Sequence, residues 1–357
     1  MTGACREKPM SNNQDNNNNA GRLSDWDWAQ LIKRIEDGKC TPFLGAGVNY
    51  GLLPLGATIA RDWATTYQFP LRESHDLARV AQFLALTRER ALPKELVQSM
   101  LEQRMRDLYR GTSPPDFTVP NHPLGVLAAL PLPTYITTNY DDFMYRALRA
   151  NRRRRAAVEI CTWATYLKGM GSVVYPDLND DRTVPRPAEF DFTESKFNSA
   201  PVFKPNADNP VVYHLHGHYS LIESMVLTEN DYLDFLVNMS RDQKLLPGQI
   251  TSALTSASLL FMGYSLADPN FRVLFRGLLH PMAETRRLSV AIQLRPSDLA
   301  QTDEGRDENF EERALNFLEK YFEDLKIKVF WGTAEEFAAE LWRRWTTRPQ
   351  RGGDGRD

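Results

Sequence analysis

The sequence predicts an α/β fold with a doubly wound, mainly parallel sheet. Short runs of β-branched and aromatic residues alternate with amphipathic stretches of helical period along most of the 357 residues. Glycine-rich or polar turns follow several of these runs, at the strand ends where open α/β sheets bind their ligands. Two helical stretches without a strand signal between them indicate a small helical layer inserted at about 71–130.

We expect one domain at 23–346, between two polar ends. Residues 1–22 are rich in Asn, Gln and Gly and predict a disordered leader, and residues 347–357 predict a disordered tail. Gly- and Pro-rich sequence at about 165–210 predicts a long loop or β-ribbon insertion. Helices are expected at 26–37, 55–67, 73–89, 94–109, 122–130, 143–150, 228–238, 247–256, 270–279, 308–322 and 334–345, and strands at 135–138, 158–162, 258–263, 288–294 and 327–331 and from Cys40 and Val211.

Composition excludes several classes of protein. A formal charge of −3 argues against a bulk electrostatic grip on nucleic acid. The sequence has no signal-peptide pattern and no apolar run long enough to span a bilayer, so we expect a cytoplasmic protein. The cysteines, Cys5, Cys40 and Cys161, form no Cys-x-x-Cys pair, which argues against a four-cysteine zinc site and a disulfide framework.

Residues 135–142, Tyr-Ile-Thr-Thr-Asn-Tyr-Asp-Asp, are the stretch around which we expect the site to form. A buried strand ends at Asn139, and Asp141 or Asp142 can cap the helix that follows. An amide and a carboxylate at a strand's carboxyl end can position a ribose or a water. The alternative is a simple helix cap beside a polar turn.

A second loop, Phe-Leu-Gly-Ala-Gly-Val-Asn, connects the strand from Cys40 to a helix. Gly45 and Gly47 would let the backbone approach a diphosphate, aided by the N-terminus of a following helix. A full dinucleotide-binding fingerprint requires a third glycine at the position where this chain has Tyr50. A tight strand-to-helix turn is therefore the alternative interpretation.

Three histidines, His214, His216 and His218, end the strand from Val211. Their spacing invites a metal interpretation, but no Cys or carboxylate cluster stands beside them in sequence. A histidine acting as general base at the carboxyl end of the strand is the better prediction. Gly263 and Ser265 follow another apolar strand and are expected at the same edge.

A basic run contains Arg146, Arg149 and residues 152–155. These side chains could meet phosphates or an acidic partner. We favour a solvated helix end, because arginine near a helix C-terminus interacts well with the macrodipole. Residues 152–155 are also a candidate contact surface for a partner.

Taken together, the loops Gly-Ala-Gly-Val-Asn, Thr-Thr-Asn-Tyr-Asp, Leu-His-Gly and Gly-Tyr-Ser-Leu resemble the sirtuin-like NADase family, in particular its bacterial antiphage-defence branch. The resemblance implies a Rossmann-like sheet that binds NAD. By the same resemblance, Asn139 would hold the attacking water at the nicotinamide ribose, and His216 would act as general base or polarise a ribose hydroxyl. The residues implied to bind NAD are Gly45, Ala46, Gly47, Asn49, Asp141, Gly263 and Ser265.

Two departures from the family pattern bear on activity. Asn49 stands where family members often have serine, and three scattered cysteines cannot build the zinc ribbon of protein deacylases. The resemblance therefore implies an NAD glycohydrolase, with NAD+ as substrate and no zinc, that depletes cellular NAD in abortive infection. Protein deacylation, ADP-ribosyl transfer and a non-catalytic NAD- or ADP-ribose-sensing module are the alternatives. The implied control is self-assembly into a homo-oligomer, or a separate regulatory partner such as a HerA-like ATPase or a short Argonaute.

Overall fold

The computed structural model describes most of the expected domain. Its described residues are 23–110, 115–118, 122–150, 154–167, 173–174, 204–242, 245–264, 288–294 and 310–349. The expected leader at 1–22, the expected helix at 270–279, most of the insertion at 165–210 and the tail beyond residue 349 lie outside the described residues.

The described strands form one eight-stranded sheet in the order β4-β3-β5-β2-β1-β6-β7-β8. β4 pairs antiparallel with β3, and the pairings among the other seven strands are parallel. The predicted mainly parallel α/β sheet is therefore confirmed. The strands are β1 (Cys40–Leu44), β2 (Thr134–Thr137), β3 (Ala157–Ile160), β4 (Val173–Val174), β5 (Val211–His214), β6 (Ser258–Met262), β7 (Ser289–Gln293) and β8 (Ile327–Trp331).

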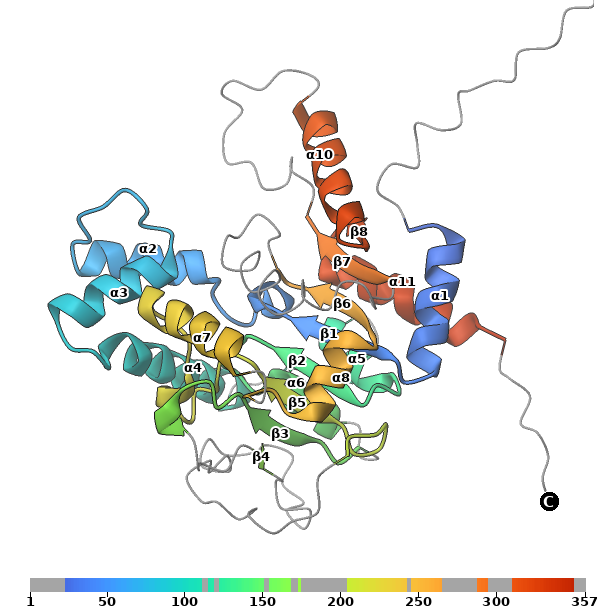
Figure 1. Ribbon diagram of the computed structural model, residues 1–357, viewed down its shortest axis with the longest axis horizontal. Helices are drawn as coiled ribbons and strands as arrows, with labels where there is room; N and C mark the ends of the chain where they lie inside the picture. Colours follow the sequence, from blue (N-terminus) through green and yellow to red (C-terminus); the bar gives the residue numbers. More distant parts are fainter. Residues whose placement is uncertain are drawn as a thin grey trace, which may run out of the picture.

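Helices cover both faces of the sheet (Figure 1). On one face α5, α6 and α11 pack together, with α1 stacked on α11 through Trp28 and Phe337. α7 and α8 cross the other face, where Thr41 of β1 donates to the carbonyl of Ala253. The helices are α1 (Asp25–Glu36), α2 (Gly56–Thr66), α3 (Leu77–Thr87), α4 (Leu92–Arg110), α5 (Pro123–Ala129), α6 (Phe143–Ala150), α7 (Glu229–Arg241), α8 (Gly248–Thr255), α10 (Phe310–Asp324) and α11 (Ala334–Thr347).

The inserted helical layer lies between β1 and β2 in the chain. α2, α3 and α4 pack in succession beside the sheet, and α3 also contacts α7 (Figure 1). The layer differs from the expected bounds of 71–130, since α2 precedes them, and α5, which lies within them, packs with α6 and α11 on the sheet. Two ion pairs join this layer to α7, Arg79 with Glu229 at 3.0 Å and Lys94 with Asp231 at 3.1 Å. The layer is thus held against the helix that follows the histidine-bearing strand.

The strands read as apolar runs because the sheet is covered on both sides. Every residue of β1, β2, β3, β5, β6 and β7 is buried, as expected of a parallel sheet between helical layers. When both faces of a strand are covered, all of its apolar side chains are removed from water. Each Å² of apolar surface buried in this way stabilises the fold by about 25 cal/mol. The core therefore runs along the sheet and supports the loops at its carboxyl edge.

The expectation that the arginine run forms a solvated helix end is wrong for Arg146 and Arg154. Arg146 is buried and forms a two-bond ion pair with Asp142, at 2.6 and 2.8 Å. Arg154 is also buried and donates to four main-chain carbonyls and to the hydroxyl of Tyr135. Arg155 is exposed. The two buried arginines therefore neutralise or cap groups inside the fold and are not a contact surface for a partner.

Arg154 is needed because of the sequence Leu-Pro-Leu-Pro after α5. Pro131 and Pro133 have no N–H, so the main chain beyond the helix offers few donors to its last carbonyls. The guanidinium supplies them instead, reaching the carbonyls of Ala128 at 2.9 Å, Leu130 at 2.7 Å and Leu132 at 2.6 Å. A positive charge at a helix C-terminus also interacts favourably with the helix dipole.

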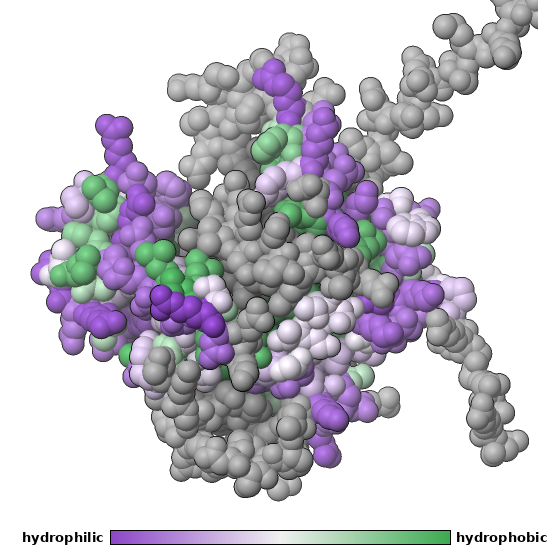
Figure 2. Space-filling model, viewed as in Figure 1, coloured by the Kyte–Doolittle hydropathy of each residue, from purple (hydrophilic) through white to green (hydrophobic). Residues whose placement is uncertain are grey.

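The surface is mixed in character. Figure 2 shows hydrophilic and hydrophobic residues interspersed over the described part of the face it presents. Large exposed apolar side chains include Leu86, Leu233 and Phe317, on different elements. Scattered exposure of this kind is ordinary for folded proteins and carries no functional argument. Among the described helices, none has both the length and the apolar character needed to span a bilayer.

Candidate functional site

Four adjacent strands end at the same level on the carboxyl edge of the sheet. The paired residues are Thr137 with His214, Leu44 with Thr137, and Leu44 with Met262. The loops that leave β5, β2, β1 and β6 therefore start side by side. From β1 the chain continues toward β2, and from β6 it continues toward β7 on the other side, so β1 and β6 form a topological switch point. Ligands of open α/β sheets bind at such a point.

The loops after β1 and β6 pack backbone against backbone. Gly45 N–H donates to the carbonyl of Met262 and Gly47 N–H to that of Gly263, both at 2.9 Å. A Cβ on Gly45 would lie 2.7 Å from the carbonyl oxygen of Gly263. Gly263 has φ +78°, and a Cβ there would lie 2.3 Å from the nitrogen of Val48. These glycines are required for contact between the two loops, a reason separate from the predicted approach to a diphosphate.

Asn139 bridges the loops after β2 and β1. Its Nδ2 donates to the carbonyl of Gly45 at 3.1 Å, and its N–H donates to Thr137 Oγ1 at 3.0 Å. Its carbonyl oxygen lies 3.0 Å from Nδ1 of His214, so a His214 tautomer with the proton on Nδ1 would donate to it. The side chain is half-buried.

His216 occupies the position on β5's loop that Asn139 occupies on β2's loop. Each lies two residues beyond the paired residues Thr137 and His214. The ring of His216 is buried, with edge-on contacts to Tyr232 at 5.3 Å and Phe235 at 5.2 Å between centroids. These aromatic neighbours come from α7, so α7 fixes the imidazole.

The Nε2 atom of His216 is buried and has no hydrogen-bond partner among the described residues. Burial of the ring lowers the pKa of His216 to about 3, so the imidazole is neutral at pH 7. An orphaned polar atom in the interior of a protein costs free energy unless a ligand or water satisfies it. A neutral imidazole nitrogen without a proton can accept a hydrogen bond from a hydroxyl group.

Asp141 and Asn49 form a buried pair that joins the same two loops. Asn49 Nδ2 donates to Asp141 Oδ2 at 2.7 Å, and Phe143 N–H donates to Asp141 Oδ1 at 3.0 Å, so Asp141 caps α6. Burial raises the pKa of Asp141 to about 7. Asn49 Oδ1 is buried without a hydrogen-bond partner among the described residues. Asn49 thus contacts the loop that carries Asn139.

Of the two remaining predicted residues, the structure describes one and not the other. Ala46 opens a 3-10 turn at Ala46–Asn49 and is exposed at the site's edge. Ser265 lies outside the described residues. The carboxyl edge thus brings together Gly45, Gly47, Asn49, Asn139, Asp141 and Gly263 through direct contacts, and His216 through strand register.

Sequence reasoning assigned no role to three residues at this edge: Thr138 and Tyr264, which lie in the quoted loops, and His214, which was named only as one of three candidate histidines. His214 contacts the main chain of Asn139, and the hydroxyls of Thr138 and Tyr264 lie 2.7 Å apart. A polar residue one or two positions before a predicted site residue is a weak signal. The strand register, which the sequence does not contain, is what makes these three residues neighbours of the site.

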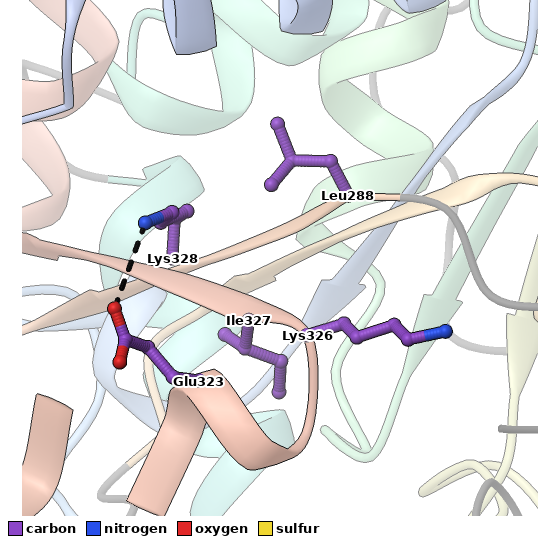
Figure 3. Close-up of a pocket in the computed structure, with 5 residues that line it drawn as sticks. All are labelled: Leu288, Glu323, Lys326, Ile327 and Lys328. Carbon is purple, nitrogen blue, oxygen red and sulfur yellow. Dashed lines mark ion pairs between the residues drawn. The ribbon is translucent and has the colours of Figure 1, made fainter. Parts of the chain in front are cut away.

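A cavity of about 310 Å³ lies elsewhere, lined by Leu288, Glu323, Lys326, Ile327 and Lys328 (Figure 3). Lys328 Nζ and Glu323 Oε1 are 3.9 Å apart across it, and the Lys326 side chain points away from this pair. The cavity lies at the amino ends of β7 and β8, the opposite edge from the histidine and asparagine. Open α/β sheets bind ligands at the carboxyl edge, so we do not assign the site to this cavity. Within the described residues, no cluster of three or more His, Cys, Asp or Glu is arranged to hold a metal ion.

Comparisons with known proteins agree with this arrangement. Residues 133–330 match the model of the SIR2-like domain, a stretch that runs from β2 into β8. The chain is 22% identical over 325 residues to the NAD(+) hydrolase ThsA of Acinetobacter baumannii (strain 532279), covering 88% of this chain and 55% of that protein. It is 23% identical over 265 residues to the NAD(+) hydrolase ThsA of Enterococcus faecium, covering 72% of this chain and 44% of that protein.

The chain spans about half the length of these curated relatives. The family match covers more than half of the chain and includes the strands that carry Asn139, His216 and Gly263. The fold, the order of the four loops and this match agree, and the chain therefore belongs to the SIR2-like domain family.

Proposed function

We propose that this chain hydrolyses NAD+ to nicotinamide and ADP-ribose at the carboxyl edge of its sheet. The observation that carries the proposal is the equivalent placement of Asn139 and His216 on neighbouring strands, beside the switch point formed by the β1 and β6 loops. The two relatives named NAD(+) hydrolase support the same activity.

The reaction breaks the bond between C1′ of the ribose and the nicotinamide nitrogen. The bonding electron pair leaves with nicotinamide, which departs neutral, and C1′ gains positive oxocarbenium character. A water oxygen then bonds to C1′ and releases one proton. The protein must therefore hold the ribose and the water in line and provide an acceptor for hydrogen bonds from the reacting hydroxyl groups.

Asn139 is suited to hold the water or a ribose hydroxyl. Its amide nitrogen is anchored on Gly45, which leaves the amide oxygen to accept a hydrogen bond from the ligand. Because the side chain is anchored before the substrate arrives, little conformational freedom is lost on binding.

His216 is suited to accept a hydrogen bond from a ribose hydroxyl. A pKa of about 3 makes the buried imidazole a weak proton acceptor, since efficient general bases have a pKa close to the working pH. We therefore assign His216 to polarising a hydroxyl, the second of its two predicted roles. Net proton release to water follows the attack.

We also propose what this activity does in the cell. The chain would deplete NAD+ in the cytoplasm during phage infection, and its activity would be regulated. The resemblance to the defence branch of the family supports it. An unrestrained hydrolase would consume its host's NAD+, so a homo-oligomeric assembly or a separate partner, such as a HerA-like ATPase or a short Argonaute, would set its activity. Measuring cellular NAD+ after phage challenge, in cells with the wild type or His216→Ala, tests this extension.

The enzymatic proposal is tested by measuring nicotinamide and ADP-ribose released from NAD+ by the full chain. Asn139→Ala and His216→Ala should each reduce turnover by at least about 100-fold, as expected when a group that acts in the transition state is removed. Glu323→Gln is the control, because that side chain lines the cavity at the opposite edge. It should retain wild-type turnover.

Two outcomes would replace the proposal with another function. Saturable NAD+ binding with no product, in every oligomeric form of the chain, would indicate a sensing module. Transfer of ADP-ribose to protein, or deacylation of an acyl-lysine peptide at a rate above NAD+ hydrolysis, would indicate one of the transferase reactions.

A further inference from the structure

Tyr264 lies where the ends of four strands meet. It follows Gly263 on the loop after β6, and its hydroxyl reaches across the end of β1 to the loop after β2. The hydroxyl oxygen lies 2.8 Å from the carbonyl oxygen of Leu44 and 2.7 Å from Thr138 Oγ1. Leu44 directly precedes Gly45, and Thr138 directly precedes Asn139.

The directions of these two hydrogen bonds follow from counting protons. A tyrosine hydroxyl has one proton, and a carbonyl oxygen can only accept, so Tyr264 donates to Leu44. The second contact must then use the proton of Thr138, which donates to the Tyr264 oxygen. Both hydroxyl groups are thereby oriented, and neither proton remains available to a second acceptor. We call the set Tyr264, Thr138 and Leu44 the tyrosine clasp.

The ring and main chain of Tyr264 are also held. The ring packs against Phe43 of β1, with centroids 5.5 Å apart, and lies so close to Gly45 that a Cβ there would be 2.9 Å from its Cε1. The carbonyl of Tyr264 accepts from Nε2 of Gln293, the last residue of β7, at 2.7 Å. The ring and the main chain of Tyr264 therefore fix the position of its hydroxyl group.

We propose that Tyr264 is a positioning residue that sets the orientation of Asn139 relative to the glycine loop. The clasp fixes the residue before Asn139 to the residue before Gly45, and the Asn139 amide then bonds to Gly45 itself at 3.1 Å. Without the clasp, no side chain from the described part of the β6 loop would tie Thr138 to Leu44. The two loops would still be joined by the Asn139 amide bond, by the Thr138 N–H and Thr137 Oγ1 bonds to Leu44, and by the Asn49–Asp141 pair. The inference rests on the proposed hydrolase function for its kinetic consequence.

Tyr264→Phe tests the clasp, because it keeps the ring against Phe43 and removes only the hydroxyl. Thr138→Val removes the second hydrogen bond from the other side with little change of shape. For each variant, kcat and KM are measured for NAD+ hydrolysis. Misplaced Asn139 should lower kcat in Tyr264→Phe by on the order of 10- to 100-fold, with KM changed less than about threefold. The double variant should be no slower than Tyr264→Phe, since the two substitutions disrupt the same group of bonds.

Amide hydrogen exchange in the absence of NAD+ supplies a readout that needs no activity. Tyr264→Phe should accelerate exchange in residues 138–142 and leave α11 at the wild-type rate. Faster exchange throughout the protein, or unchanged exchange together with unchanged kcat, would overturn the proposal. If the wild type leaves NAD+ intact, the hydrolase function fails, and the exchange measurement alone still decides whether the clasp holds the Asn139 loop.

Discussion

Replacing Arg154 with methionine should strongly destabilise the fold, although the residue lies in a run of arginines that looks solvated. Methionine fills much of the same volume and removes the donors to the carbonyls of Ala128, Leu132 and Ala207. Ala207 is only half-buried, so we count the first two alone. The carbonyl of Leu130 retains the N–H of Leu132 at 2.8 Å. Leaving a buried polar group unsatisfied costs about 1–3 kcal/mol, so two carbonyls amount to about 2–6 kcal/mol. Relief of the guanidinium's own desolvation offsets part of this, and we expect a loss of about 2–4 kcal/mol.

The assay is urea unfolding followed by far-UV circular dichroism, with Arg155→Met as the matched control. Arg155 is exposed, so its replacement should change the free energy of unfolding by less than about 0.5 kcal/mol. Arg154→Lys should fall between the two, because lysine keeps the charge but lacks the planar fork that reaches several carbonyls. Equal unfolding midpoints for Arg154→Met and Arg155→Met would refute the reasoning.

Two further predictions concern stability. Burial raises the pKa of Glu159 from 4.5 to about 7, so the folded chain keeps a proton that the unfolded chain has lost, and this contribution to stability disappears as the pH rises from about 4.5 to about 7. Glu159→Gln should therefore gain stability relative to the wild type over that range in urea unfolding, and parallel pH profiles would contradict the assignment. Gly263→Ala should lower the unfolding free energy by at least about 1–3 kcal/mol, because of its positive φ and the clash with Val48. The control Gly248→Ala, in open space at the start of α8, should be neutral or slightly stabilising, and equal effects of the two substitutions would sink the argument.

The alternation of strands and helices could be predicted because burial on both faces leaves a direct mark on the sequence. The runs at 135–138 and 327–331 correspond to β2 and β8 within a residue at each end. The order of strands could not be predicted in this way. β5 lies between β3 and β2 although it follows both in the chain, and an apolar run does not identify its neighbours.

The buried arginines show a different limit. Arg154 and Arg155 are adjacent and chemically identical, and one is buried while the other is exposed. The difference is that Arg154 donates to carbonyls more than twenty residues earlier in the chain. These carbonyls lack main-chain donors because Pro131 and Pro133 have no N–H. Two prolines directly after a predicted helix are a sequence signal for such a need, but they do not say which donor meets it.

At the candidate site, position was predictable and contact was not. Asn139, His216 and Gly263 were expected at strand ends because parallel strands present their carboxyl ends at one edge. The pairing of Asn49 with Asp141 and the reach of Tyr264 over β1 depend on strand register and on loops packing side by side. Neither contact produces a periodic pattern in the sequence from which it could be predicted.

The central claim is that NAD+ binds at the carboxyl edge formed by β1, β2, β5 and β6. The most direct test is an experimental structure of the His216→Ala variant with NAD+, since slow turnover would preserve the substrate. We expect NAD+ against the packed Gly45 and Gly263 loops, with its nicotinamide ribose beside Asn139. NAD+ in the cavity beside Lys326, or an empty carboxyl edge at saturating NAD+, would contradict it.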